Sequence, residues 1–401
     1  MSGIIIIGAG QAAGQAAASL RQEGYEGTIT LIGDESFAPY QRPPLSKQYL
    51  SGELSIDRVY IRPTKFYEDR NIDLQLGARV TSIDRQNKTI STDNGQTLAY
   101  QKLLICTGSR PRELNIPGSD LPGIHYLRRL DDVDRIRDDM ASANSICIIG
   151  GGYIGLEVAA VAVTAGLSVN ILEMESRILQ RVTNQQMSAF YHRLHTDRGV
   201  NIHTSTACTV FKGDARVNSV LCQDQSIAAD MVIVGIGILP NIELAQQAGL
   251  ECDNGILVDD HCRTSDPDIF SAGDCTNHPN PILGRRLRLE SVPNAMEQAR
   301  TSAANMLGGD KTYAAVPWFW SDQYELKLQM VGFSSDGDTA VLRGDPEALQ
   351  FATFYLKDGK VVAVDAVNSP KEFMVAKRLY GMQVNADSLA DSAIDLKSLI
   401  S

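Results

Sequence analysis

The chain has 401 residues, of which 43% are apolar and 21% are charged, a balance that excludes a disordered protein. At about 150 residues per domain, this length predicts two or three domains. The formal net charge of -11 argues against a general nucleic-acid binder or a binder of anionic membranes, since either needs a strongly positive face. The longest apolar runs, such as residues 231–239, are too short to span a membrane.

The cysteines and the first residues favour a reducing compartment. The 7 cysteines are well separated, so no CxxC or CxxxxC redox pair and no zinc-type spacing occurs, and we expect no metal site. Separated, unpaired cysteines suit a reducing environment. The chain opens on MSGIIIIGAG, without a basic stretch or a small-residue cleavage site. We therefore expect a cytoplasmic protein.

Two segments repeat one pattern and predict two dinucleotide-binding units. Residues 4–35 and 146–173 each contain an apolar strand-like run, a glycine turn, an Ala-rich helix-forming stretch and a second β-branched run. Each opens on GxGxxG/A, formed by Gly8, Gly10 and Ala13 in the first copy and by Gly150, Gly152 and Gly155 in the second. The first glycine makes the turn, the second lets a pyrophosphate approach the backbone, and the third small residue lets the helix pack on the strand. A lone motif would also fit a simple glycine turn, but the pair predicts two bound dinucleotides.

An acidic residue after each second strand predicts which nucleotide is bound. Glu173 ends the second strand of the second unit, where a carboxylate accepts hydrogen bonds from the adenosine ribose hydroxyls. Because it would repel a 2′-phosphate, Glu173 favours NADH over NADPH, although Arg177 could pair with such a phosphate. In the first unit, Asp34 is the candidate for the ribose, ahead of Glu35. An ordinary acid in a surface turn is the alternative in both units.

The order of motifs along the chain resembles that of a known family. The first fingerprint, the segment CTGS at 106–109, the second fingerprint and the segment AGD at 272–274 are similar in order to the two-dinucleotide flavoprotein reductases of the glutathione-reductase fold. Three further segments resemble, more narrowly, the oxygenase-coupled ferredoxin reductases: RPPLSK at 42–47, ESVPNA at 290–295 and PWFWSDQY at 317–324. The resemblance covers essentially the whole chain.

The resemblance implies FAD in the first unit and NADH in the second. Around FAD it places Gly8, Gly10, Ala12 and Ala13 on the phosphate loop, Asp34 on the ribose, Lys47 by the flavin ring, Val80 by the adenine, Thr107 and Gly108 in the CTGS segment, Arg128 at the FAD edge, Asp274 on the ribitol and Val292 by the pyrimidine side of the ring. Around the nicotinamide cofactor it places Gly150, Gly152, Tyr153, Ile154 and Gly155 on the phosphate loop, Glu157 near the carboxamide, Glu173 on the ribose, and Gly237. Catalytic roles are expected for Lys47, Glu157 and Trp320.

The loop around Lys47 carries a chemical argument. A lysine beside the flavin can hydrogen-bond N5 and stabilise added electron density, whereas a solvated loop lysine is the alternative. The dithiol reductases of this fold use a cysteine pair in this loop, and the peroxidase and CoA-disulfide members use a single cysteine there. The segment APYQRPPLSKQYL, residues 38–50, contains none. Electrons must therefore leave the flavin directly, which fits transfer to a one-electron protein carrier.

The predicted fold is α/β, with two Rossmann-like dinucleotide-binding domains, one inserted in the other, and a C-terminal α+β domain. We expect the FAD-binding domain at residues 1–112 and 242–312, the NADH-binding domain at 113–241, and the C-terminal domain at 313–401. In the last domain, Asp358-Gly359 predicts a hairpin turn. The segment from Ser369 to Glu372 predicts a capping box with Pro370 at the first helical position.

We therefore expect a monomeric, NADH-dependent flavoprotein that passes single electrons to a [2Fe–2S] ferredoxin feeding a monooxygenase or a dioxygenase. Rubredoxin is an alternative carrier, and a non-catalytic, NADH-sensing flavoprotein resembling apoptosis-inducing factor is an alternative function. Trp318 is expected to face the carrier and Trp320 the flavin, with core packing as the alternative. Arg285, Arg286 and Arg288 could steer an acidic ferredoxin, or could form an ordinary solvated loop.

Overall fold

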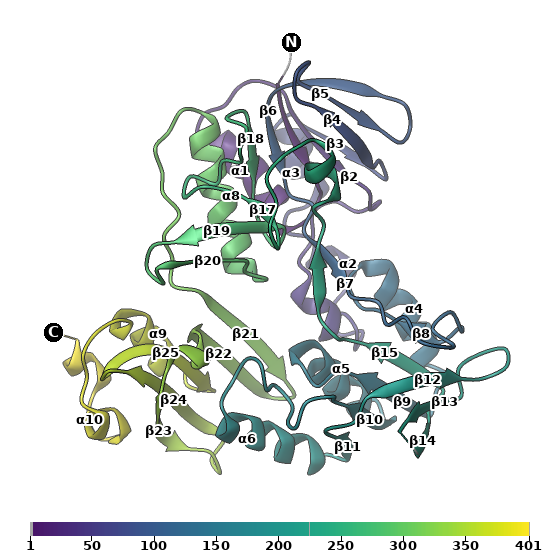
Figure 1. The fold of residues 1–401 in the computed structure, drawn as a ribbon, viewed down its shortest axis with the longest axis vertical. Helices are drawn as coiled ribbons and strands as arrows, with labels where there is room; N and C mark the ends of the chain where they lie inside the picture. Colours follow the sequence, from purple (N-terminus) through teal and green to yellow (C-terminus); the bar gives the residue numbers. More distant parts are fainter. Residues whose placement is uncertain (1–2, 224, 401) are drawn as a thin grey trace. The chain divides into compact units, whose positions relative to one another are not determined.

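The computed structural model describes residues 3–223 and 225–400, which form two compact units (Figure 1). The first unit contains Met1–Arg42, Ser55–Arg110 and Ile238–Pro317, and the second contains Pro43–Leu54, Pro111–Gly237 and Trp318–Ser401. Each unit is thus assembled from segments far apart in the sequence. The domain boundaries expected after residues 112, 241 and 312 stay predictions. No helix within the described ranges combines the length and the apolar character that crossing a membrane requires.

A 7-stranded sheet forms the centre of the first unit. Its strands run in the order β3 (Ile72–Leu76), β2 (Ile29–Gly33), β1 (Gly3–Ile7), β6 (Thr97–Ile105), β5 (Thr89–Thr92) and β4 (Val80–Asp84), with β18 (Ile269–Ser271) also paired to β6. The pairs among β1, β2, β3, β6 and β18 are parallel, whereas β4 and β5 continue the sheet in antiparallel fashion. Ile4 and Ile6 of β1 belong to one apolar cluster, and Ile5 and Ile7 belong to another. Because alternate residues of a strand point to opposite faces of the sheet, β1 is buried on both faces.

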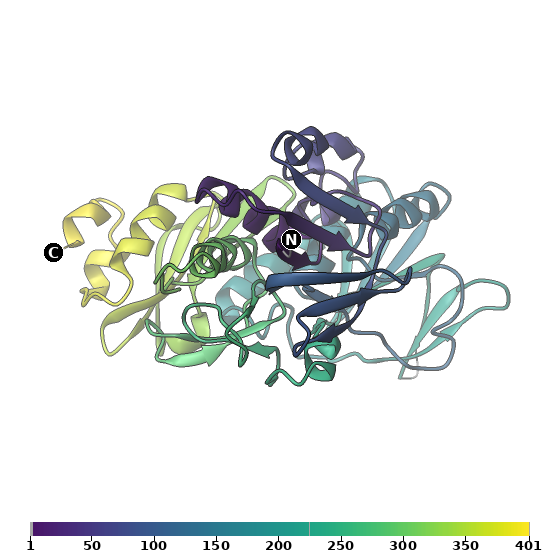
Figure 2. The same cartoon turned by 90° about the horizontal axis from the view of Figure 1, so that it is seen from above.

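Two helices from opposite ends of this unit's sequence lie side by side against the sheet. They are α1 (Gln11–Gln22), which follows the first glycine turn, and α8 (Val292–Met306) (Figure 1 and Figure 2). Fully buried alanines, Ala13 and Ala17 on α1 and Ala299 and Ala303 on α8, allow this close approach. The remaining elements are α2 (Ile56–Val59), α3 (Thr64–Asp69), α7 (Glu243–Gln247), the pair β7 (Ser109–Pro111) and β16 (Ile238–Pro240), and the small sheet β17 (Ile256–Leu257), β19 (Thr276–Asn280) and β20 (Arg285–Leu287).

The second unit contains a 5-stranded parallel sheet that repeats the first dinucleotide-binding pattern. Its order is β11 (Val200–His203), β10 (Ser168–Leu172), β9 (Ser145–Ile149), β15 (Met231–Val234) and β8 (Ile124–His125), with every pair parallel. Helix α5 (Tyr153–Thr164) connects β9 to β10, as α1 connects β1 to β2. The other elements are η1 (Pro43–Ser46), α4 (Leu130–Met140), α6 (Gln185–Thr196) and the antiparallel strands β12 (Cys208–Lys212), β13 (Ser219–Cys222) and β14 (Gln225–Ala228).

A 5-stranded antiparallel sheet forms the C-terminal part of the second unit. The order is β21 (Trp318–Gln323), β22 (Leu326–Gly332), β25 (Lys360–Val367), β24 (Gln350–Lys357) and β23 (Thr339–Asp345). Helix α9 (Pro370–Leu379) packs on β22 and β25, and α10 (Ala386–Ala390) packs on β23, at the yellow end of the chain in Figure 2. The short helices η2 (Ser334–Asp336) and η3 (Leu396–Leu399) complete it. The predicted fold, two Rossmann-like units and a C-terminal α+β part, is confirmed.

Two local predictions for the C-terminal sheet have different outcomes. The hairpin between β24 and β25 turns at Asp358 and Gly359, whose φ angles of 49° and 73° are left-handed, as predicted. Ser369 is the N-cap of α9 and Pro370 begins the helix, but no side chain caps this helix within the described residues. The Ser369 hydroxyl donates instead to the Val367 carbonyl oxygen at 3.0 Å. The predicted capping box is therefore wrong: the Ser369 hydroxyl is turned toward the end of β25, and its oxygen accepts from no N–H of the first helical turn among the described residues.

Candidate functional site

The two glycine turns predicted from the sequence have the same geometry in the two units. Gly8 has a φ angle of 111° and Gly150 has one of 109°, both in the left-handed region. A Cβ atom at Gly8 would lie 2.2 Å from the Cys106 carbonyl oxygen, and one at Gly150 would lie 2.4 Å from the Gly235 carbonyl oxygen. Only glycine fits either turn, because both the backbone angle and the neighbouring strand exclude a side chain.

The second glycine of each motif leaves a helix N-terminus accessible. Gly10 is the N-cap of α1 and Gly152 is the N-cap of α5, and no side chain among the described residues caps either helix. A Cβ atom at either glycine would meet no atom of the described residues within 4 Å. The first backbone N–H groups of these helices, at the positive end of the helix dipole, are therefore available to a pyrophosphate. Each cradle therefore fits the pyrophosphate of a dinucleotide such as FAD or a nicotinamide dinucleotide.

The remaining FAD-side motifs meet at the carboxyl ends of two neighbouring parallel strands, β6 and β18. The Thr107 hydroxyl, just after β6, donates to the Asn241 carbonyl oxygen at 2.6 Å. Asp274, just after β18, accepts from the Ser109 hydroxyl at 2.9 Å. A Cβ atom at Gly273 would lie 3.3 Å from the Ala12 Cβ, so this motif lies against the start of α1. In open α/β sheets, ligands bind at this edge of the strands.

The two acids that follow β2 have different surroundings. The Asp34 carboxylate pairs with the Arg79 guanidinium at 3.1 Å, and 35% of its side chain is exposed. The Glu35 side chain is only 13% exposed and accepts from Arg42 at 2.7 Å and from the Tyr40 hydroxyl at 2.5 Å. Asp34 therefore stays the better candidate for a ribose, because more of its side chain is exposed than of the Glu35 side chain.

Three further FAD candidates occupy separate positions. Val80 begins β4 and is buried in an apolar cluster of the first unit, so it can offer a ligand its backbone more readily than its side chain. Val292 is the first residue of α8, directly after the N-cap Ser291. Arg128 belongs to the second unit, where its backbone N–H donates to the Asp132 carboxylate at 3.0 Å. Lys47 also belongs to the second unit.

Glu173 ties the second glycine loop to the end of β10. Its carboxylate accepts from the Gly151 N–H at 2.7 Å and from the Glu175 N–H at 2.8 Å, and each oxygen keeps a further lone pair for a ribose hydroxyl. The Arg177 guanidinium donates to three backbone carbonyl oxygens, those of Gln180, Thr183 and Asn184. The guanidinium is thus committed to its own loop. Its contacts do not support the alternative, raised by the sequence, that Arg177 pairs with a 2′-phosphate.

The start of α5 presents two different side chains. Ile154 is 42% exposed. The Tyr153 hydroxyl donates to the Met330 Sδ at 2.8 Å, and its ring centroid lies 5.4 Å from that of Phe319. Gly237 follows β15 with a φ angle of 105°, and a Cβ there would meet no described atom within 4 Å.

A buried ion pair joins Lys47 and Glu157 within the second unit. The Lys47 Nζ lies 2.8 Å from the Glu157 Oε2, and the two side chains are 10% and 1% exposed. The Ser46 hydroxyl donates to the same Oε2 at 2.5 Å, and the Ser321 hydroxyl donates to Oε1 at 2.6 Å. Lys47 is therefore not a solvated loop lysine. The sequence did not indicate Ser46 or Ser321, because each reaches Glu157 only through the fold.

The cysteines are not organised for thiol chemistry. All seven are free; five are buried, and Cys208 and Cys252 are partly buried. Burial raises the pKa of the Cys208 thiol and of the Cys262 thiol to about 12 each. The thiolate is the reactive form, so these thiols are poor nucleophiles at neutral pH.

The two tryptophans share one face of β21. Their ring centroids are 5.7 Å apart, and the Trp318 ring also lies 5.6 Å from that of Phe373. The Lys377 Nζ sits 4.0 Å from the Trp318 centroid, and burial lowers the pKa of this ammonium. Trp318 is thus the centre of a half-buried aromatic and cationic cluster on the C-terminal part of the second unit.

The arginines within β20 and directly after it are partly committed to the fold. Arg286 donates to the carbonyl oxygens of Val258 and Asn277, both at 2.7 Å. Arg288 forms an ion pair with Glu290 at 2.6 Å. The net charge of this segment is therefore smaller than that of its three arginines alone, because Glu290 neutralises Arg288, while Arg286 keeps its charge and is held in place by the carbonyl oxygens.

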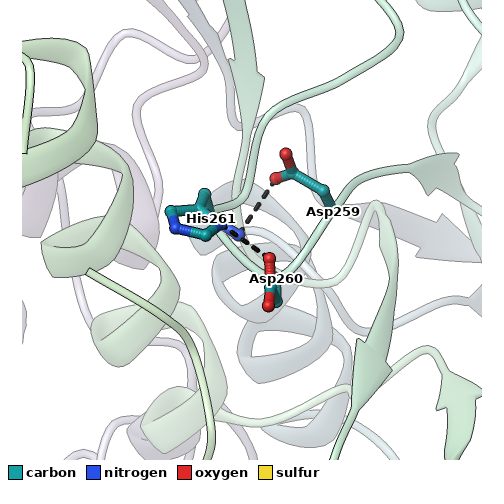
Figure 3. A group of neighbouring side chains, drawn as sticks. All are labelled: Asp259, Asp260 and His261. Atoms are coloured by element: carbon teal, nitrogen blue, oxygen red, sulfur yellow. Dashed lines mark hydrogen bonds and ion pairs between the residues drawn. The ribbon is translucent and has the colours of Figure 1, made fainter. Parts of the chain in front are cut away.

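Among the described residues, one group of three could hold a metal ion: Asp259, Asp260 and His261 (Figure 3). His261 has its Nδ1 2.6 Å from the Asp260 carboxylate and its Nε2 2.8 Å from that of Asp310. The Asp259 carboxylate accepts from the backbone N–H groups of His261 and Arg263, at 3.0 Å and 2.8 Å. Each member already has a protein partner, so the group stabilises this turn.

The chain matches two protein-family models. Residues 2–299 match the pyridine nucleotide-disulphide oxidoreductase model, and residues 318–400 match the reductase C-terminal model. The chain is 42% identical over 406 residues to putidaredoxin reductase CamA of Pseudomonas putida, covering 99% of this chain and 96% of that protein. It is 42% identical to the ferredoxin–NAD(+) reductase component of the anthranilate 1,2-dioxygenase system of Burkholderia cepacia, covering 99% of this chain and 98% of that protein.

A solved structure has the same fold over the whole length. The covalent putidaredoxin reductase–putidaredoxin complex contains a chain that matches with a TM-score of 0.96 and 42% identity, covering 100% of this chain and 98% of that one. The predicted family and cofactor classes are thereby confirmed. The chain belongs to the pyridine nucleotide-disulphide oxidoreductase family and is an oxidoreductase that uses FAD and NAD(P)H.

Proposed function

We propose that this protein takes a hydride from NADH and passes the electrons one at a time to a [2Fe–2S] ferredoxin that feeds an oxygenase. Bound FAD supplies the chemistry that connects a two-electron donor to a one-electron acceptor. Two relatives matched over nearly their full length are a putidaredoxin reductase and a ferredoxin reductase of a dioxygenase system, which supports this acceptor class. We also propose that the protein works as a monomer.

The observation that carries the proposal is the loop at residues 38–50, which holds a buried lysine and no cysteine. Lys47, held by Glu157, is proposed to donate a hydrogen bond to the flavin ring and to stabilise the negative charge that arrives with the hydride. Glu157 orients this ammonium and lies near the carboxamide of the nicotinamide. Because the loop has no thiol, no disulfide step stands between the flavin and the carrier.

The dinucleotide contacts are proposed from the resemblance to the oxygenase-coupled ferredoxin reductases, and the geometry of each unit supports some of them. For FAD they are Gly8, Gly10, Ala12 and Ala13 at the pyrophosphate, Asp34 at the ribose, Val80 at the adenine, Thr107, Gly108 and Asp274 at the ribitol side, and Arg128, Val292 and Trp320 around the ring. For NADH they are Gly150, Gly152, Tyr153, Ile154 and Gly155 at the pyrophosphate, Glu173 at the ribose, and Gly237. The open helix starts at Gly10 and Gly152 support both pyrophosphate positions.

The nucleotide preference is tested with Glu173→Gln, which removes the charge but keeps one acceptor oxygen. We expect wild type to prefer NADH over NADPH by at least about tenfold in kcat/KM, and the variant to narrow that ratio. Glu175→Gln is the matched control, because that side chain accepts from Gln180 at 3.0 Å in the same turn. Comparable wild-type kcat/KM values for the two nucleotides would show that Glu173 does not select the ribose.

The carrier is tested by anaerobic mixing of the NADH-reduced protein with a [2Fe–2S] ferredoxin and, separately, with a rubredoxin. We expect rapid reduction of the ferredoxin and a lower kcat/KM for the rubredoxin. Faster reduction of the rubredoxin would change the proposed carrier. Failure to reduce either protein, with a reduced complex that persists, would favour the NADH-sensing alternative. Light scattering of the FAD-loaded protein tests the proposed monomer.

A further inference from the structure

A line of buried polar side chains leads away from Glu157, on the side opposite Lys47. The Ser321 Oγ lies 2.6 Å from the Glu157 Oε1, and the Gln323 Nε2 lies 3.1 Å from the Ser321 Oγ. The His195 Nε2 follows at 2.9 Å from the Gln323 Oε1. Glu157 is 2% exposed and Gln323 is 1% exposed, and Ser321 and His195 are fully buried. Hydrogen bonds in such a dry environment are strong, and a broken one is costly.

The line ends at the turn between β21 and β22. The Tyr324 hydroxyl lies 3.0 Å from the His195 Nδ1. The Arg198 guanidinium covers the Tyr324 ring, 4.2 Å from its centroid, and pairs with Glu325. Ser321 and Gln323 are two residues apart on β21 and so share a face, while His195 comes from the last turn of α6. Five side chains from these elements and from α5 thus form one row of hydrogen bonds, which runs through Glu157, Ser321, Gln323, His195 and Tyr324.

The carboxylate at one end determines the direction of every hydrogen bond in the row. Because the Glu157 carboxylate only accepts, Ser321 must donate to it and must itself accept from the Gln323 amide N–H. The Gln323 oxygen then faces His195, which must donate from Nε2. Burial lowers the pKa of His195 to about 4, so at neutral pH the ring carries one N–H and its Nδ1 accepts from Tyr324. All four hydrogen bonds point toward Glu157.

The opposite direction would remove a donor from Glu157. With the proton of His195 on Nδ1, the Gln323 amide would turn its N–H to the imidazole and its oxygen to Ser321. The Ser321 hydroxyl would then donate to Gln323 and leave the Glu157 Oε1 without it. The tautomer of one histidine and the solvation of this buried carboxylate are therefore coupled across three hydrogen bonds.

We propose that His195 is a positioning residue, which acts through Gln323 and Ser321 to hold the Glu157 carboxylate, and through it the Lys47 ammonium, in the orientation that the hydride step needs. This inference rests on the proposed place of Lys47 beside the flavin. The carboxylate keeps its Ser46 bond in either state. The row therefore controls whether the Glu157 Oε1 receives a hydrogen bond, and so how the carboxylate is oriented toward the Lys47 ammonium.

The row is tested first by nuclear magnetic resonance, without turnover. Long-range proton–nitrogen spectra of the FAD-loaded protein with labelled histidines report the tautomer, and His195→Gln identifies the signal. We expect the Nε2–H form in wild type and a mixture of both tautomers in Ser321→Ala, which cuts the row between Gln323 and Glu157. Tyr191→Phe is the control, because this tyrosine lies on the same helix and its hydroxyl has no hydrogen-bond partner among the described residues. It should leave the His195 signal unchanged.

The functional consequence is measured as the rate of flavin reduction by NADH in single-turnover mixing. We expect Ser321→Ala and Tyr324→Phe to slow this step by about threefold to tenfold, with the dissociation constant for NADH within about twofold of wild type. Tyr324→Phe removes one partly buried hydroxyl and keeps the ring under Arg198, so it tests the row where Ser321→Ala fails to fold. Tyr191→Phe should react like wild type.

The results separate this inference from the proposed function. An Nδ1–H tautomer in wild type, a His195 signal that Ser321→Ala does not change, or an unchanged hydride step in both variants overturns the positioning role. Any of these leaves NADH oxidation and ferredoxin reduction by wild type intact. A wild type that NADH does not reduce would overturn the proposed function instead, whatever the tautomer of His195.

Discussion

The buried carboxyl of Asp365 on β25 makes the stability of the second unit depend on pH. Its Oδ2 accepts from the Thr183 hydroxyl at 2.6 Å and from the Tyr355 hydroxyl at 2.7 Å. Burial raises the pKa of Asp365 from 3.8 to about 6, because the two hydroxyl donors only partly replace the water that a carboxylate loses. The group thus holds its proton more tightly in the folded chain than in the unfolded chain.

The sign and size of the effect follow from this difference in pKa. Between pH 4 and pH 6 the folded state binds more protons than the unfolded state, so the free energy of unfolding falls as pH rises. The contribution is complete below the unfolded pKa and is lost above the folded one. A difference of about 2 pKa units corresponds to about 3 kcal/mol. Asp365→Asn, which carries no charge, should therefore raise the free energy of unfolding at pH 8 by about 1–3 kcal/mol.

The assay is urea unfolding of the FAD-loaded protein at pH 5 and pH 8, followed by tryptophan fluorescence. The chain has 2 tryptophans, Trp318 and Trp320, and both lie in the second unit, so the signal reports the unit that contains Asp365. Asp358→Asn is the control, since that side chain is exposed at the hairpin turn of the same sheet and asparagine tolerates a left-handed φ. If Asp365→Asn is less stable than wild type at pH 8, the ionised carboxylate is favourable there and the reasoning is refuted.

Three further outcomes are expected. Gly152→Ala should weaken NADH binding by about tenfold without lowering the Tm, because its Cβ meets no described atom within 4 Å but enters the space proposed for the pyrophosphate; an unchanged dissociation constant would move that site. Alkylation of accessible cysteines should leave NADH-to-ferricyanide turnover almost unchanged, and inactivation prevented by NADH would contradict direct transfer from the flavin. Trp318→Ala should raise the KM for ferredoxin, with only a modest salt effect, while flavin reduction by NADH stays nearly intact; equal slowing of both steps would make Trp318 a packing residue.

The sequence determined those features that depend on neighbouring residues. The glycine turns at Gly8 and Gly150 were predictable because each βαβ unit lies within about 35 consecutive residues, and its strand, turn and helix restrict the residue types locally. The Asp358-Gly359 hairpin was predictable for the same reason. The importance of the Lys47 loop also came from local composition, from a lysine that closely follows two prolines and from the lack of cysteine.

The tertiary structure decided which side chains complete these motifs. Ser46 and Ser321 reach Glu157 across 111 and 164 residues, and His195 reaches Gln323 across 128, separations that no periodicity links. The sequence allowed Arg177 to bind a phosphate, but in the structure its guanidinium donates to three carbonyl oxygens of its own loop. A buried polar group must take whichever partner the packing of distant segments brings within about 3 Å, and local sequence does not contain that information.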